Sequence, residues 1–157
     1  MSTAIDDLWP VEIASVTDEV PPVTILKQQA SLLGQKTKNI VEGKVETTLS
    51  DNEGVLRHTL YLVAPALNFY RYPLLDVEHK ATSMYPAKIK VRSAEKSQKD
   101  IRDDIWDLQN APADNEEEFK NKLKSVFADE ETKKIIGALL AQSGGKKPPK
   151  KRIISDY

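Results

Sequence analysis

Residues 67–79 (LNFYRYPLLDVEH) concentrate side chains that could do chemistry. Asp76, Glu78 and His79 stand close together there, and carboxylates with an imidazole bind metal ions or transfer protons. On an extended strand, however, residues 76 and 78 share one face, whereas residue 79 points to the other. The sequence supplies no evident third ligand, so this run predicts neither a metal site nor a catalytic site.

The rest of the chain carries no motif for catalysis or cofactor binding. The patterns G-x-S-x-G, G-x-G-x-x-G and Walker A are missing, and there is no cysteine. The other histidine, His58, is expected on the core side of a strand beside Thr47, as a hydrogen-bonded structural residue. We therefore predict no catalytic residue, no metal and no cofactor. A small enzyme with an unrecognised site is an alternative.

Three segments space their apolar residues as one-faced helices do. They cover residues 21–38, 115–128 and 130–143. The last two have candidate cap residues, which are Asp114 or Asn115 and Asp129. Residues 100–110 fit a helix and a short edge strand equally well.

Between the first helix and the other two, the pattern predicts strands joined by short turns. These strands cover residues 40–49, 55–64, 68–79 and 85–92, and short connections favour antiparallel neighbours. One-faced helices need a sheet to cover, and one-faced strands need helices. We therefore predict an α+β fold with two layers. It has an antiparallel β-meander of about four or five strands, with an N-terminal helix and two C-terminal helices on one face.

The turns also predict the register of the strands. A turn over residues 51–54 pairs Leu49 with Leu56, and a turn near Thr82 pairs Asp76 with Lys88. Because side chains alternate along a strand, this register decides which residues meet the helices and which lie on the open face.

Alternation divides the tyrosine-rich segment between the two faces. The expected core residues are Phe69, Leu75 and Val77. Tyr70 and Tyr72 are expected on the open face. Pro73 cannot donate a hydrogen bond to its neighbour, so it predicts a bulge that also turns Arg71 outward.

The predicted open face gathers the candidate partner-binding residues. They are Tyr61, Tyr70, Arg71, Tyr72, Lys88, Lys90 and Arg92. Tyrosine and arginine together are typical of protein interfaces, so we expect a protein partner, with a homodimer as one form. Aromatic and basic residues on a sheet also bind single-stranded nucleic acid, although the interspersed carboxylates argue against phosphate contacts. The simplest interpretation is a solvated face on which opposite charges pair across strands.

The two ends of the chain differ in charge from the middle. Residues 1–26 contain five carboxylates and no lysine or arginine. Five cations lie near the other end, namely Lys146, Lys147, Lys150, Lys151 and Arg152. We predict an acidic N-terminal arm at 1–20, a single α+β domain at 21–143 and a basic C-terminal tail at 144–157.

Each end has more than one interpretation. Trp9 is expected to pack back onto the domain, and the alternatives are a segment that binds a partner and plain disorder. The tail either keeps the chain in solution or contacts nucleic acid or another anionic partner.

Composition restricts the class of protein. The chain has 157 residues, of which 39% are hydrophobic and 30% charged, enough for one domain with a core. It has no apolar run near the ~20 residues that span a membrane, and no secretory signal pattern at its start. The absence of cysteine fits a reducing compartment. We therefore expect a small soluble cytoplasmic binding or adaptor protein, without membrane contact, that acts through its open sheet face, its terminal segments or both.

Overall fold

The computed structural model describes residues 5–15, 17–50, 53–92 and 111–144. Its elements, in chain order, are η1 (Ile13–Ser15), α1 (Pro22–Lys36), β1 (Glu42–Leu49), β2 (Val55–Ala64), η2 (Pro65–Leu67), β3 (Tyr70–Lys80), β4 (Lys88–Val91), α3 (Glu116–Ala128) and α4 (Glu130–Gln142). The ambiguous residues 100–110 lie outside the described residues, and so does the basic tail beyond Gly144.

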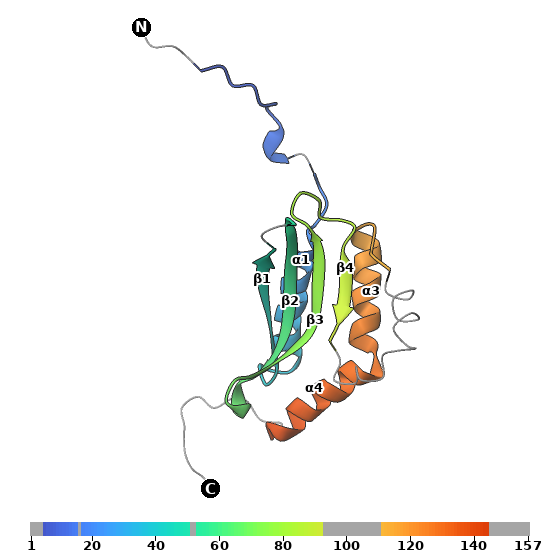
Figure 1. Ribbon diagram of the computed structural model, residues 1–157. Helices are drawn as coiled ribbons and strands as arrows, with labels where there is room; N and C mark the ends of the chain where they lie inside the picture. The colour runs from blue at the N-terminus through green and yellow to red at the C-terminus, as the bar shows by residue number, and fades with distance from the viewer. Residues whose placement is uncertain (1–4, 16, 51–52, 93–110, 145–157) are drawn as a thin grey trace.

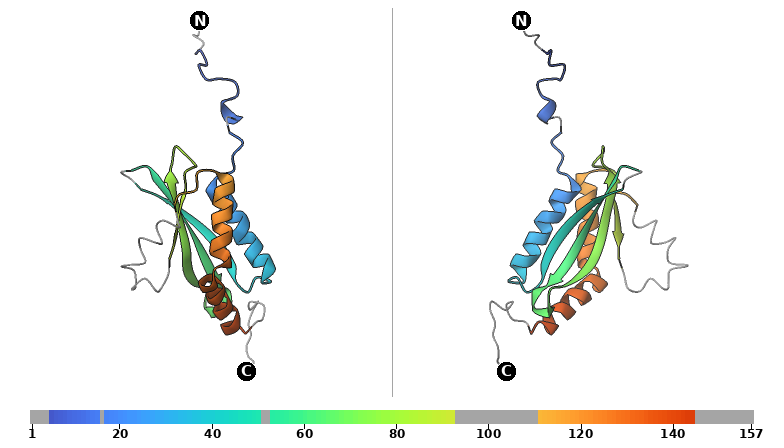
Figure 2. Two further views of the ribbon diagram at one scale, coloured as in Figure 1. Left: turned by 90° about the vertical axis from the view of Figure 1, so that its right-hand side faces the viewer. Right: turned by 60° about the vertical axis from the view of Figure 1, so that its left-hand side comes forward.

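The four strands form one antiparallel sheet in the order β1-β2-β3-β4. Figure 1 shows the sheet in front of α1, and the side view in Figure 2 shows all three helices on the same face. The predicted two-layer α+β meander is therefore confirmed, with four strands. None of the helices described is long and apolar enough to cross a membrane.

Local sequence signals begin and end the helices. Pro22 occupies the first position of α1, where its missing N–H is not needed. The Asn115 side chain caps α3 by accepting a hydrogen bond of 2.9 Å from the Glu118 N–H. Asp129 ends α3 and caps α4, accepting from the Glu131 N–H at 3.0 Å. Both predicted cap positions are confirmed.

The core lies between the sheet and the helices. Its largest fully buried side chains include Ile25, Leu26, Val41, Leu62, Leu74, Leu75, Val77, Ile89 and Phe119. Phe119 and Leu123 of α3 are buried as their spacing predicts. Phe127, one turn further along α3, and Ile136 of α4 are only half-buried.

The first hairpin has the predicted register. In the last hairpin the predicted register is wrong by two residues, because Asp76 pairs with Lys90 rather than with Lys88. The strands continue up to Lys80 and start again at Lys88, so the turn is centred one residue later than expected, at Ser83. A shift of two residues leaves every side chain of β4 on its predicted face.

A bulge in β3 interrupts its pairing with β2. Leu60 pairs with Leu75, but Tyr61 pairs with Pro73, so Leu74 has no partner in β2. Pro73 occupies the site of the break, where its missing N–H is tolerated. One extra residue inverts the alternation of side chains for everything that precedes it in the strand.

The inverted alternation confirms one sequence prediction and overturns another. Arg71 pairs with Val63 and lies on the open face, as predicted. Tyr70 and Tyr72 are moved to the helix side by the same bulge, so their predicted place on the open face is wrong. Tyr72 pairs with the buried Leu62 and packs, half-buried, against the core.

Phe69 was expected in the core, but its side chain is 68% exposed. Asn68 and Phe69 both take left-handed backbone conformations, with φ of 61° and 57°, as the chain turns after η2. Phe69 therefore precedes the first paired residue of β3, and strand alternation does not determine its direction.

Helix α1 approaches the sheet closely at Gly43 of β1. A Cβ built on Gly43 would lie 2.7 Å from both Cα and Cβ of Ala30. Side chains essentially never approach so closely, so this position accepts only glycine as long as α1 keeps its place.

We expect Gly43→Ala to lower the free energy of unfolding by roughly 1–3 kcal/mol, because α1 must move away from the sheet. The control is Gly137→Ala in α4, where a new Cβ meets nothing within 4 Å. This control should raise stability by roughly 0.5–1 kcal/mol, since alanine is the better helix former. Urea unfolding measures both values, and equal effects would contradict the close approach.

Candidate functional site

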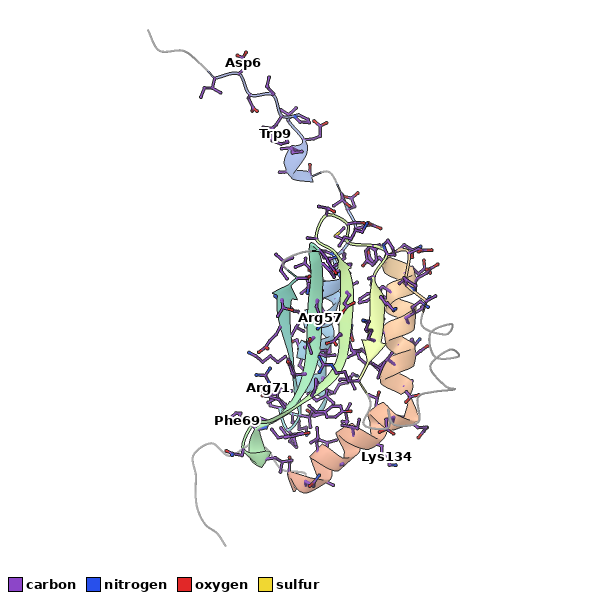
Figure 3. All side chains as sticks on the ribbon, in the orientation of Figure 1. Asp6, Trp9, Arg57, Phe69, Arg71 and Lys134 are labelled. Atoms are coloured by element: carbon purple, nitrogen blue, oxygen red, sulfur yellow. The ribbon has the colours of Figure 1, made fainter. Side chains whose placement is uncertain are left out.

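The open face of the sheet is covered by ion pairs that cross the strands. Glu78 binds Arg57 at 2.8 Å and Lys90 at 3.2 Å, and Arg71 binds Glu46 at 3.0 Å. Partial burial would raise the pKa of Glu78, but its hydrogen bonds to Arg57 and Lys90 outweigh burial and lower it. Figure 3 shows Arg57 in the middle of this face.

Asp76 is the least exposed charge of the open face, with 6% of its surface accessible. Its Oδ1 accepts hydrogen bonds from Thr59 Oγ1 at 2.7 Å and from Arg92 Nη2 at 3.2 Å. Its Oδ2 accepts from Arg92 Nε at 3.0 Å. The hydrogen bonds to Asp76 raise the pKa of Arg92.

A ring–guanidinium contact forms between Tyr61 and Arg71, whose Cζ lies 4.0 Å from the ring centre. The Tyr72 hydroxyl donates to the Arg92 carbonyl at 3.1 Å. Burial, followed by the charge of Glu131 in α4, raises the pKa of Tyr72, as expected for a ring on the helix side.

The predicted partner-binding residues are therefore divided between two faces. Those on the open face are Tyr61, Arg71, Lys88, Lys90 and Arg92. Tyr70 and Tyr72 are absent from it. The cross-strand ion pairs of the simplest interpretation are present, and they engage Arg57, Arg71, Lys90 and Arg92.

We expect Arg92→Ala to lower the free energy of unfolding by roughly 1–3 kcal/mol, because it leaves the buried Asp76 carboxylate under-bonded. Arg71→Ala is the control, since the side chains of its ion pair are 41% and 42% exposed. Such exposed pairs contribute at most about 1 kcal/mol. Chemical denaturation measures the free energy of unfolding of both variants. A larger loss of stability from Arg71→Ala than from Arg92→Ala would contradict this prediction.

A second cluster joins the two histidines on the helix side of the sheet. His58 Nδ1 lies 2.8 Å from Thr47 Oγ1, and His58 Nε2 lies 2.9 Å from His79 Nε2. His79 Nδ1 lies 2.8 Å from the Lys80 carbonyl and 3.0 Å from that of Ser83. The expected hydrogen bond between His58 and Thr47 is confirmed. The contact with His79 was not anticipated, because the register between β2 and β3 had not been derived.

The direction of each hydrogen bond in this chain follows from its last acceptors. Carbonyl oxygens only accept, so His79 Nδ1 carries a proton and its Nε2, in the neutral ring, accepts. His58 Nε2 must then donate, and His58 Nδ1 accepts from the Thr47 hydroxyl. With this arrangement all four ring nitrogens are hydrogen-bonded, whereas protons on both Nε2 atoms would set two N–H donors against each other.

Burial is the main cause that lowers the pKa of His58 to about 4, and the charges of His79 and Lys27 add to it. A free histidine titrates near 6.5. Between these two pH values, the unfolded chain binds a proton at His58 that the folded chain does not bind. The folded state therefore loses stability as the pH falls from 6.5 toward 4.

The expected loss reaches roughly 2 kcal/mol at pH 4.5, measured by urea unfolding at a series of pH values. His58→Gln removes the titrating ring and should flatten the profile between pH 6.5 and 4.5. A variant that keeps the wild-type slope would show that other groups cause the loss.

The third feature is the point at which the N-terminal arm joins the domain, at Val20. The Val20 N–H donates to Glu116 Oε1 at 3.1 Å, and its carbonyl accepts from the Tyr85 hydroxyl at 2.7 Å. Burial, followed by the charges of Glu116 and Glu19, raises the pKa of Tyr85 to about 12 and keeps it a donor. Nothing in the sequence could reveal this contact, because Val20 and Glu116 are 96 residues apart.

Before Val20, the arm projects away from the domain. Its apolar side chains are Ile5, Leu8, Trp9, Val11 and Ile13, with exposed fractions of 92%, 88%, 71%, 98% and 46%. The expected packing of Trp9 on the domain is therefore wrong, as Figure 3 shows. We call the two hydrogen bonds of Val20 to Glu116 and Tyr85 the clamp at Val20. This clamp and the extended Pro21 (φ −64°, ψ 151°) together direct the chain away from the helices.

The fourth feature is an apolar groove beside α1, on the helix side of the sheet. Its deep part has a volume of about 220 Å³ and is lined by Gln29, Ala30, Leu32, Leu33, Lys36, Leu60, Leu62, Leu74, Phe127 and Ile136. A shallower part continues over Thr24, Lys27, Gln28 and Ser31 and shares Gln29 and Leu32. We call both parts together the α1 groove.

Within the part of the chain that the structure describes, no three histidine or acidic side chains are grouped so that they could hold a metal ion. No protein family, curated protein or solved structure matches this chain. Its function must therefore be inferred from these four features alone.

Proposed function

We propose that this chain is an adaptor that binds a protein partner through its N-terminal arm. The observation that supports this proposal is the exposure of Leu8 and Trp9, at 88% and 71%. Neighbouring apolar side chains exposed in this way are typical of interaction sites, and tryptophan is the residue most enriched in binding hot spots.

The clamp at Val20 supports the same function. Because both backbone groups of Val20 are bonded to the domain, the arm starts from a fixed point. The arm's own hydrogen bonds are local turns, such as Trp9 N–H to Asp7 Oδ1 at 3.1 Å and Ile13 N–H to the Pro10 carbonyl at 3.1 Å. These turns shorten the segment without covering its apolar side chains.

The charge of the arm indicates the chemistry of its partner. Asp6 and Asp7 directly precede Leu8 and Trp9, and the arm has no cation. A partner would therefore offer an apolar groove with basic residues at its rim, as in other cases where a short segment docks by a few anchor side chains.

The test is affinity capture from nuclease-treated lysate with the Leu8→Ala, Trp9→Ala double variant. We expect partner recovery to fall at least about tenfold, which is 1.4 kcal/mol. Thermal unfolding should not change, because these side chains are exposed. The control is Lys88→Ala with Lys90→Ala on the open face. If the control loses the partner and the arm variant keeps it, the partner binds the open face of the sheet and the proposal is wrong.

A further inference from the structure

The α1 groove and the arm have opposite charges. Helix α1 contains Lys27 and Lys36 and no carboxylate, whereas the arm contains carboxylates and no cation. Lys36 lines the deep part of the groove, and Lys27 lines the shallow part. Among the described residues, Lys36 is the charged side chain that lines the deep part, and it has the sign that an acidic segment requires.

The deep part of the groove has room for a tryptophan ring. A cavity of about 150 Å³ lined by Leu, Ile and Phe holds a benzene ring. The volume of about 220 Å³ here is large enough for the bicyclic indole. Leu32 at its edge is 41% exposed, so this apolar lining contacts water when the groove is empty.

We propose that the arm of one copy of this chain docks in the α1 groove of a second copy, with Trp9 in the deep part. This inference rests on the proposed function, since it names the arm's partner. A reciprocal exchange would occupy both arms and both grooves, and would close the assembly at two chains.

The point at which the arm joins the domain favours the groove of a second copy over its own. Val20 is bonded at the N-terminal end of α1, whereas the deep part is lined by the second half of that helix, from Gln29 to Lys36. The extended Pro21 directs the chain away from α1 (Figures 1 and 3). To reach its own groove, the arm would have to reverse direction against this geometry.

The first measurement follows self-association and the arm together. Trp106→Phe leaves Trp9 as the single tryptophan of the full chain. With rising concentration, sedimentation equilibrium should show conversion from monomer to dimer, and the Trp9 emission should shift to the blue in parallel. Trp9→Ala in the wild-type chain should weaken the dimer at least about tenfold.

The second measurement tests the groove. Leu32→Glu places a carboxylate where the acidic arm would lie, and should also weaken the dimer at least about tenfold. Gln35→Glu is the control, because it makes the same charge change on the same helix outside the groove. It should leave the dimer within about twofold of wild type.

Mixing the two defective chains distinguishes exchange from self-docking. The Trp9→Ala chain keeps an intact groove and the Leu32→Glu chain keeps an intact arm, so an equimolar mixture should form heterodimers although neither chain dimerises alone. A blue-shifted emission that is independent of concentration would mean docking within one chain and would overturn the proposal.

A monomer with unshifted emission at every concentration would also overturn it. In that case the proposed function is judged separately by whether the Leu8→Ala, Trp9→Ala variant loses a different protein in the capture experiment.

Discussion

The unpaired Leu74 in β3 decides which side chains of the sheet meet the helices and which meet water. With Leu74 inserted, both Leu74 and Leu75 point into the core, and Arg71 reaches the open face to contact Glu46 and Tyr61. Tyr72 is carried to the other face, where its hydroxyl binds the Arg92 carbonyl. Without this one residue, an arginine would face the core and two tyrosines would face solvent.

That constraint gives the two faces of the sheet different properties. The open face is a set of charges that satisfy one another, with Asp76 held by Thr59 and Arg92. The helix face is mostly apolar, and its polar groups include the hydrogen-bonded pair His58 and His79 and the half-buried Tyr72. In the described chain, large exposed apolar side chains lie on the arm and at Leu32 of the α1 groove, and also at Leu49, Phe69 and Tyr70.

Patterns of short range predicted the architecture. Helix spacing, cap residues such as Asp129 and the short turns were sufficient for the order of the elements and the helix-covered face. Pro73 was sufficient to predict the bulge, because proline has no N–H to donate to the neighbouring strand. The inversion of Tyr70 and Tyr72 follows from the same bulge, but only when the bulge is counted in the register of every earlier residue.

Other features depend on contacts that local patterns do not encode. The pairing of His58 with His79 requires the register between β2 and β3, and the α1 groove requires the relative placement of three helices. The direction of the arm depends on Glu116 and Tyr85, which are distant from Val20 in the sequence.

The clamp at Val20 also determines how a pulling force would travel through the molecule. Tension on a bound arm reaches the hydroxyl of Tyr85 and the carboxylate of Glu116 before it reaches α1. Tyr85 lies in the turn between β3 and β4, and Glu116 in the first turn of α3, whereas β1 and β2 have no bond to Val20 in the described structure. The load is therefore shared between α1, which continues the covalent chain at Pro22, and the region of Tyr85 and α3, which the two hydrogen bonds connect to Val20.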